Sequence, residues 1–97
     1  MVTPCMTIDH KQIDELLQNQ KNFMKLISSC VFMNSLCLAI GDFIDLKTFL
    51  TLLFVEQCST QQLAEYYHVK PTIIEDWITK TYRIITALMR KKIIQIE

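Results

Sequence analysis

The chain has 97 residues, which suits one domain and leaves little room for a second. Its ten acidic and ten basic residues cancel to a net charge of zero, so the total charge gives no indication of a nucleic-acid partner. One glycine and two prolines are fewer turn residues than a strand-rich fold of this size needs, and we therefore predict an all-α fold of four to five helices.

Hydrophobic residues make up 51% of the chain. A chain this short buries only about 60–65% of its surface when it folds alone, so part of the apolar surface is expected to face a partner, most simply a second copy in a homodimer. The uncharged stretch 26–41 is 16 residues long, and a membrane span needs about 20. We interpret it as a core or interface helix, and the start, which lacks signal-peptide features, favours a cytoplasmic protein.

The four cysteines, Cys5, Cys30, Cys37 and Cys58, form no C-x-x-C pair. We interpret them as small buried hydrophobic residues in a reducing cytosol. Because only His10 and His68 accompany them, we expect neither a metal site nor a cofactor.

The first part of the chain shows a helical pattern. After a loose leader over residues 1–7, Thr7 or Asp9 can cap a helix, and apolar residues recur at steps of three and four. They are Ile13, Leu16, Leu17, Phe23, Met24, Ile27, Val31 and Leu38. We predict a helical segment over residues 9–40, either continuous or broken near Ser28-Ser29. Its second half is apolar nearly all round, so it is expected to be buried on several sides or to pack on another copy.

Residues that typically begin or end helices divide the rest of the chain into three further helices. Gly41 ends the first segment, and Asp45 can cap a helix over residues 46–57 whose inward stripe is Phe49, Leu50, Leu53 and Phe54. Ser59 and Gln62 have the spacing of a capping box at the start of a short helix over residues 60–67. A tight link over residues 68–70 then leads to Pro71, which suits the first position of a last helix over residues 71–92.

Residues 60–80 have the pattern of two helices that meet across a tight turn. Ala64 is small where the second helix must come close. Five further positions are expected to form the shared core at spacings suited to helices crossing at about 90–120°. These are Leu63, Tyr67, Val69, Ile74 and Trp77.

This pattern resembles the helix-turn-helix of bacterial and phage transcription regulators over the 21 residues from Thr60 to Lys80. The resemblance implies a cytoplasmic regulator that binds double-stranded DNA as a homodimer, with its second helix in the major groove. One departure is His68, where the family usually has glycine in a left-handed conformation. Histidine is among the residues that tolerate this conformation, so a structural role is expected for His68.

The resemblance also assigns a candidate DNA-binding face on the last helix. Carried onto this sequence, the exposed candidates are Lys70, Thr72, Glu75, Asp76, Thr79, Lys80 and Arg83. Lys70 and Lys80 suit phosphates, and Arg83 extends the basic strip. Charge distribution agrees, because residues 1–69 carry four basic and seven acidic side chains and residues 70–97 carry six basic and three acidic ones.

Glu75 and Asp76 oppose this assignment, since phosphates repel carboxylates. They can instead accept from a cytosine amino group, favour the start of the helix, or pair with a neighbour such as Lys80. They also motivate a second hypothesis, in which the same fold serves as a protein-interaction module, an adaptor or an antagonist of a regulator. No catalytic motif is present, and we expect no enzyme.

The tail leaves several interpretations open. Ile84, Ile85, Leu88 and Met89 are expected to pack on the first helical segment or on a second subunit. The basic residues 90–92 suit either a DNA backbone or the end of the helix. Residues 93–96 can form a short strand or an interface strip.

Overall fold

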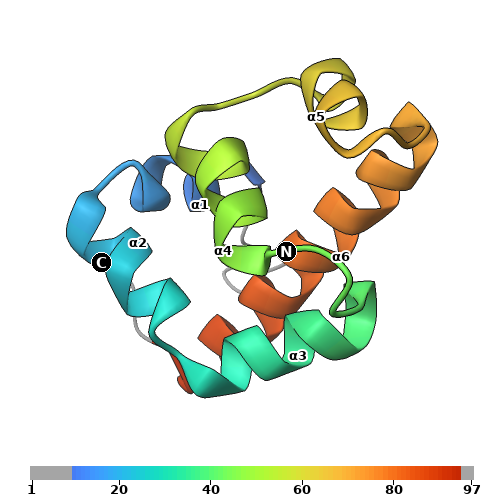
Figure 1. Cartoon of the computed structure of the whole chain (residues 1–97). Coiled ribbons are helices and arrows are strands. Elements are labelled where there is room, and N and C mark those ends of the chain that lie inside the picture. The colour runs from blue at the N-terminus through green and yellow to red at the C-terminus, as the bar shows by residue number, and fades with distance from the viewer. Residues whose placement is uncertain (1–9, 95–97) are drawn as a thin grey trace, which may run out of the picture.

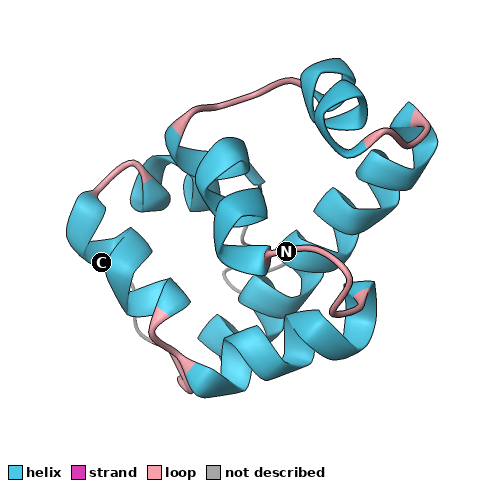
Figure 2. Ribbon diagram, viewed as in Figure 1, coloured by secondary structure: helices cyan, strands magenta, loops and turns pink. Residues whose placement is uncertain are grey.

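The computed structural model describes residues 10–94, and the expected cap at Thr7 or Asp9, the leader, Cys5 and Ile96 lie outside them. Within this range every regular element is a helix (Figure 2). The elements are α1 (His10–Leu17), α2 (Gln20–Ile27), α3 (Cys30–Ile40), α4 (Leu46–Leu50), the π-helical turn η2 (Thr51–Val55), α5 (Thr60–Tyr67) and α6 (Pro71–Arg90). The predicted all-α fold is confirmed, with more helices than expected because the first segment is divided.

The segment 9–40 is three helices. The expected break at Ser28-Ser29 is present, and Ser29 caps α3 by accepting from the Phe32 N–H at 3.2 Å. A second break was not predicted. Asn19 ends the run from α1 because its side-chain oxygen accepts from the Lys21 N–H at 2.8 Å and so caps α2. Asparagine side chains compete in this way for backbone groups that a continuous helix would use.

The central helix is capped as predicted, with Asp45 accepting from the Lys47 N–H at 3.1 Å. It was expected to be α-helical to residue 57, and this is wrong beyond Leu50. The turn Thr51–Val55 is a π-helix, in which the Glu56 N–H donates to the Thr51 carbonyl five residues back at 2.9 Å. Phe49, Leu50 and Phe54 are buried and Leu53 is half-buried, so the inward stripe is confirmed. A wide turn carries one residue more than an α-helical turn.

Helix α4 lies between the α1–α2 pair and the α5–α6 pair, and α3 crosses below them (Figure 1). The long helix α6 packs on both α3 and α5. Ile85 and Leu88 are buried, so the apolar tail of α6 is covered within the chain. The Lys80 ammonium donates to the Ala39 carbonyl at 3.2 Å and so satisfies a carbonyl in the last turn of α3.

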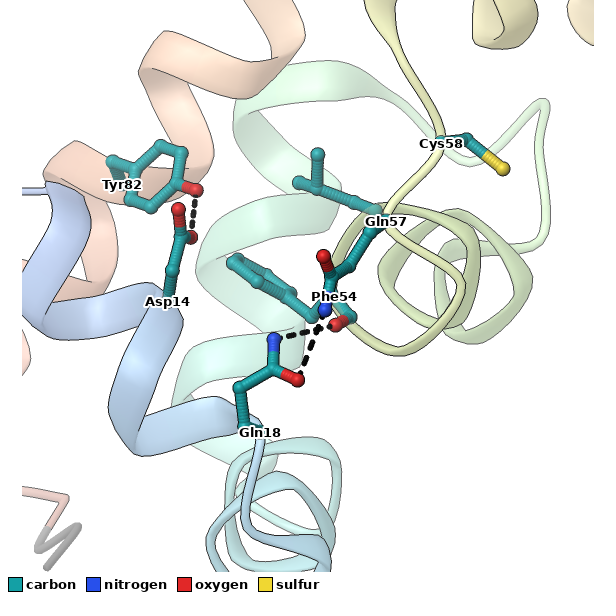
Figure 3. Close-up of a pocket in the computed structure, with 7 residues that line it drawn as sticks. Asp14, Gln18, Phe54, Gln57, Cys58 and Tyr82 are labelled. Atoms are coloured by element: carbon teal, nitrogen blue, oxygen red, sulfur yellow. Dashed lines mark hydrogen bonds between the residues drawn. The ribbon is translucent and has the colours of Figure 1, made fainter.

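Polar contacts join α1 to η2 and α6 around a cavity of about 230 Å³ (Figure 3). The Tyr82 hydroxyl of α6 donates to Asp14 of α1. The Gln18 amide donates to the Phe54 carbonyl at 3.4 Å and accepts from the Gln57 amide at 2.9 Å. Burial and the Asp14 contact both raise the pKa of Tyr82, so this hydroxyl keeps its proton and remains a donor.

Only one face of α3 is buried inside the chain. Phe32, Leu36 and Ile40 face the core, whereas Val31 is 47% exposed and Leu38 is 89% exposed. The expectation of buried cysteines is wrong for Cys30, which is exposed because it stands at the first position of α3. Cys37 and Cys58 are half-buried, and these three thiols are free.

None of the helices within residues 10–94 has, by itself, the length and hydropathy to cross a bilayer. Helices α2 and α3 reach that length and hydropathy only as a pair, and the pair is bent by 69°.

Candidate nucleic-acid interface

Helix α5 begins at the predicted capping box. The Ser59 hydroxyl accepts from the Gln62 N–H at 3.1 Å, and the Gln62 side-chain oxygen accepts from the Ser59 N–H at 2.8 Å. Two amide groups at the start of the helix are thereby satisfied. The cap fixes where α5 starts, and therefore which of its residues face α6.

The turn between α5 and α6 begins with a left-handed residue, as expected. His68 adopts φ 57° and ψ 45°, and the Val69 N–H returns to the Ala64 carbonyl at 3.0 Å. Helix α6 then begins at Pro71, whose missing N–H is not needed at the first helical position. Three residues, 68–70, thus connect the two helices.

Replacing His68 with glycine is expected to raise the free energy of unfolding by about 0.5–1 kcal/mol. The left-handed conformation costs an L-residue about 1–2 kcal/mol, and the extra chain entropy of glycine offsets part of that gain. Urea denaturation measures the difference. His68→Ala is the matched control, since alanine keeps the Cβ and should give no stabilisation. Equal effects of the two changes would contradict a strained backbone at this position.

The two helices share a small core. Leu63, Ala64, Ile74 and Trp77 are buried. Tyr67 and Val69 are half-buried and pack against the same core. The Trp77 ring lies 5.7–5.8 Å, centroid to centroid, from the rings of Phe43, Phe49 and Tyr67. Edge-to-face aromatic contacts of this kind stabilise beyond the area they bury, so Trp77 links α6 to α4, to α5 and to the loop before α4.

The Tyr67 hydroxyl oxygen is buried, and it has no hydrogen-bond partner among residues 10–94. Burial raises the pKa of Tyr67 from 10.0 to about 12, and the charges of Tyr66 and Asp45 add to this shift. The folded protein therefore holds the phenol proton at a pH where the unfolded chain has lost it. The free energy of unfolding is therefore unaffected by this ionisation below about pH 10 and falls as the pH rises towards 12, because the folded state disfavours the ionised phenol.

Tyr67→Phe is expected to raise the free energy of unfolding at neutral pH by about 1 kcal/mol, because it removes a buried polar atom that lacks a partner. It should also flatten the decline in stability between pH 10 and 12. Urea midpoints at neutral and alkaline pH test both effects. Tyr66→Phe, at an exposed ring on the same helix, is the control. A loss of stability in Tyr67→Phe alone would show that the hydroxyl is bonded.

The candidate DNA-binding residues do not all share one surface. Lys70 and Glu75 are exposed near the start of α6. The residues Thr72, Asp76, Thr79 and Arg83 follow at steps of four, three and four, so they form one exposed stripe along the helix. Lys80 lies beside this stripe and is turned towards α3, where it donates to Ala39.

The charge of Asp76 is partly offset inside the protein. Its carboxylate lies 2.9 Å from the Lys80 ammonium, and this is the one ion pair within residues 10–94. Pairing with Lys80 was one of the alternatives expected for Asp76. Glu75 has no such partner within that range, so it is the acidic group that a phosphate would meet. The positive charge of α6 is concentrated in its second half, from Arg83 onwards.

Sequence reasoning left out two residues beside this face, His10 and Thr86. Thr86 is three residues after Arg83, and helical spacing alone would have placed it on the stripe. His10 is stacked on the Tyr82 ring, with centroids 4.0 Å apart. This contact joins the first residue of α1 to α6 across the fold, so no local pattern in the sequence could reveal it.

Comparison of the chain with protein-family models, with curated proteins and with solved structures found no match.

Proposed function

We propose that the protein is a small cytoplasmic transcription regulator that binds double-stranded DNA with the first half of α6 in the major groove. The observation that carries this proposal is the arrangement of α5, the three-residue turn and α6. Trp77 and Ile74 hold one side of α6 in a buried core, while the stripe from Thr72 to Arg83 is left exposed. A helix supported in this way can present its first turns to base edges.

Binding of random-sequence duplex DNA across a salt series tests the proposal. Affinity should fall steeply with salt, and Lys70→Ala should reduce the slope by about one. Lys25→Ala removes the same charge from α2 and is the matched control. Lys80→Ala added to Lys70→Ala should change the slope little further, because Lys80 is engaged with Asp76 and Ala39. Absence of binding at low salt would overturn the proposal.

Glu75 provides a second discriminating test. If Glu75 lies near phosphates, Glu75→Gln relieves repulsion and should raise affinity about equally for all sequences. If Glu75 accepts from a cytosine amino group, the same change should lower affinity for sites with cytosine at one position. Binding to a small panel of duplexes separates the two cases. An affinity that does not change on any duplex would place Glu75 away from DNA.

We further propose that the regulator is a homodimer formed through α3. No charged residue interrupts α3, and its exposed residues Val31 and Leu38 lie two turns apart on one side of the helix. Sedimentation of the wild type should give a dimer and that of Leu38→Asp a monomer. Val55→Asp, at an exposed apolar residue of η2, is the control. A wild type that sediments as a monomer at high concentration would overturn this assignment.

The alternative is a protein-interaction module built on the same fold. The exposed side chains of Phe43, Tyr66 and Ile73, which are 66%, 58% and 40% accessible, favour it because they lie on or next to the helix pair. A partner protein would cover these residues, whereas a DNA-binding face is usually polar and basic. A stable oligomer that does not bind DNA at low salt would support this alternative.

A further inference from the structure

The cavity of about 230 Å³ between α1, η2 and α6 has a lining that is polar on one side and apolar on the other (Figure 3). Its polar side is formed mainly by Asp14, Gln18 and Gln57, and its apolar wall by Leu53 and Phe54. No lysine, arginine or histidine among residues 10–94 lines it, so the single charged group of the lining is a carboxylate. Gln18 and Gln57 are exposed, and the cavity therefore meets solvent beside them.

The hydrogen bonds around the cavity leave acceptor oxygens unused. Asp14 accepts from the Tyr82 hydroxyl at Oδ1, and its Oδ2 forms no hydrogen bond within residues 10–94. The Gln57 amide nitrogen donates to Gln18 at 2.9 Å, which leaves the Gln57 amide oxygen as an acceptor. Asp14 also has no ion-pair partner within that range, where the one ion pair lies on α6. A ligand with a positive charge and hydrogen-bond donors therefore complements this side of the cavity.

The end of η2 shapes the cavity. Gln57 has a left-handed backbone with φ 55°, and the Cys58 N–H donates to the Leu52 carbonyl at 2.9 Å. This geometry ends the helix and directs the Gln57 side chain towards Gln18 (Figure 3). The Gln18 amide also donates to the Phe54 carbonyl at 3.4 Å. The polar side of the cavity is thus held in place by contacts between α1 and η2, and π-helical turns such as η2 recur at functional sites.

We propose that the cavity binds a small organic cation, a protonated primary amine attached to a short apolar body. The ammonium group donates to the Asp14 carboxylate and to the Gln57 amide oxygen, and the apolar body lies against Leu53 and Phe54. A cavity of about 150 Å³ holds benzene, so this one has room for about nine non-hydrogen atoms. None of the lining residues belongs to the exposed stripe of α6, so the site is separate from the proposed DNA-binding face.

NMR titration of the full chain tests the proposal. The probe is phenethylammonium, which is of the expected size, and 2-phenylethanol is its uncharged match. Phenethylammonium should give saturable shifts of the Gln18 and Gln57 side-chain amides, with a dissociation constant on the order of 1 mM for so small a ligand. The alcohol should bind about tenfold more weakly, because it cannot form a charge-assisted hydrogen bond with Asp14.

Asp14→Asn removes the charge and keeps an oxygen that can accept from Tyr82. It should weaken binding of the amine about tenfold and leave binding of the alcohol unchanged. Glu15→Gln, the matched control, loses the same charge from an exposed residue of α1 outside the lining and should bind the amine as the wild type does. Gln57→Glu adds a carboxylate at an exposed position of the lining and should raise the affinity for the amine severalfold, which tests the site even if Asp14→Asn is unfolded.

Three results would overturn the inference. Equal affinities of the wild type for the amine and the alcohol would show that the cavity does not select a cation. Equal losses in Asp14→Asn and Glu15→Gln would indicate attraction by the overall charge of the protein. Absence of saturable shifts in the lining with either probe would show that the cavity does not hold ligands of this class. None of these titrations contains DNA, so their failure would leave the proposed function intact.

Discussion

Trp77→Ala is expected to lower the free energy of unfolding by about 3–5 kcal/mol, the usual cost of removing a buried aromatic ring. The Trp77 side chain is only 5% exposed and contacts three other aromatic rings. A small domain has a total stability of about 5–15 kcal/mol, so this single change removes a large part of it. Because the chain has one tryptophan, urea denaturation is best followed by far-UV circular dichroism.

Ile73→Ala is the control for this prediction, because Ile73 is on the same helix and 40% exposed. Its effect should be below about 1 kcal/mol, since exposed substitutions leave no cavity. A Trp77→Ala variant as stable as the control would mean that α6 is not anchored at this point. The proposed support for a recognition helix would then fail as well.

Ala64→Leu is expected to lower the free energy of unfolding by about 1–3 kcal/mol through overpacking. Ala64 is 5% exposed and lies on the buried side of α5, which packs against α6. The larger side chain has to push the two helices apart or distort the turn, in which the Ala64 carbonyl accepts from Val69. DNA affinity should fall too, because the exposed stripe of α6 is held in position by α5.

Gln61→Leu adds an apolar side chain of similar size at an exposed position of the same helix. This control should leave stability within about 0.5 kcal/mol and DNA affinity unchanged. Comparing denaturation and duplex binding for the two variants separates overpacking from a simple gain of hydrophobic surface. If Ala64→Leu binds DNA as the wild type does, the close contact between α5 and α6 is not needed for binding.

Local chemistry made parts of this fold predictable from the sequence. The caps at Asp45 and Ser59, the left-handed turn at His68 and the start at Pro71 each depend on residues within a few positions. Asn19 was not identified as a cap because it lies among other polar residues, where periodicity gives no sign of a break. The π-helical turn was also missed, because its side-chain pattern differs little from that of an α-helix.

Tertiary contacts limited what could be predicted about the candidate site. Lys80 looked like a free phosphate ligand, but its carbonyl partner Ala39 is 41 residues away. His10 reaches the surface of α6 only through its contact with Tyr82. Spacing identifies residues that share one helix face, as for Thr72 and Arg83. It does not show which groups from other helices bind those residues or lie beside them.

The π-helical turn has a consequence for changes in chain length. In this turn the Glu56 N–H bonds to a carbonyl five residues back, whereas an α-helix spans four. Loss of one residue between Thr51 and Val55 would convert the wide turn to an α-helical one, with little rotation of the later part of the chain. The same loss in the first half of α6 would rotate all later residues by about 100° and turn Arg83 away from its stripe. A single-residue deletion would therefore be absorbed by the π-helical turn. In α6 it would change which residues are exposed.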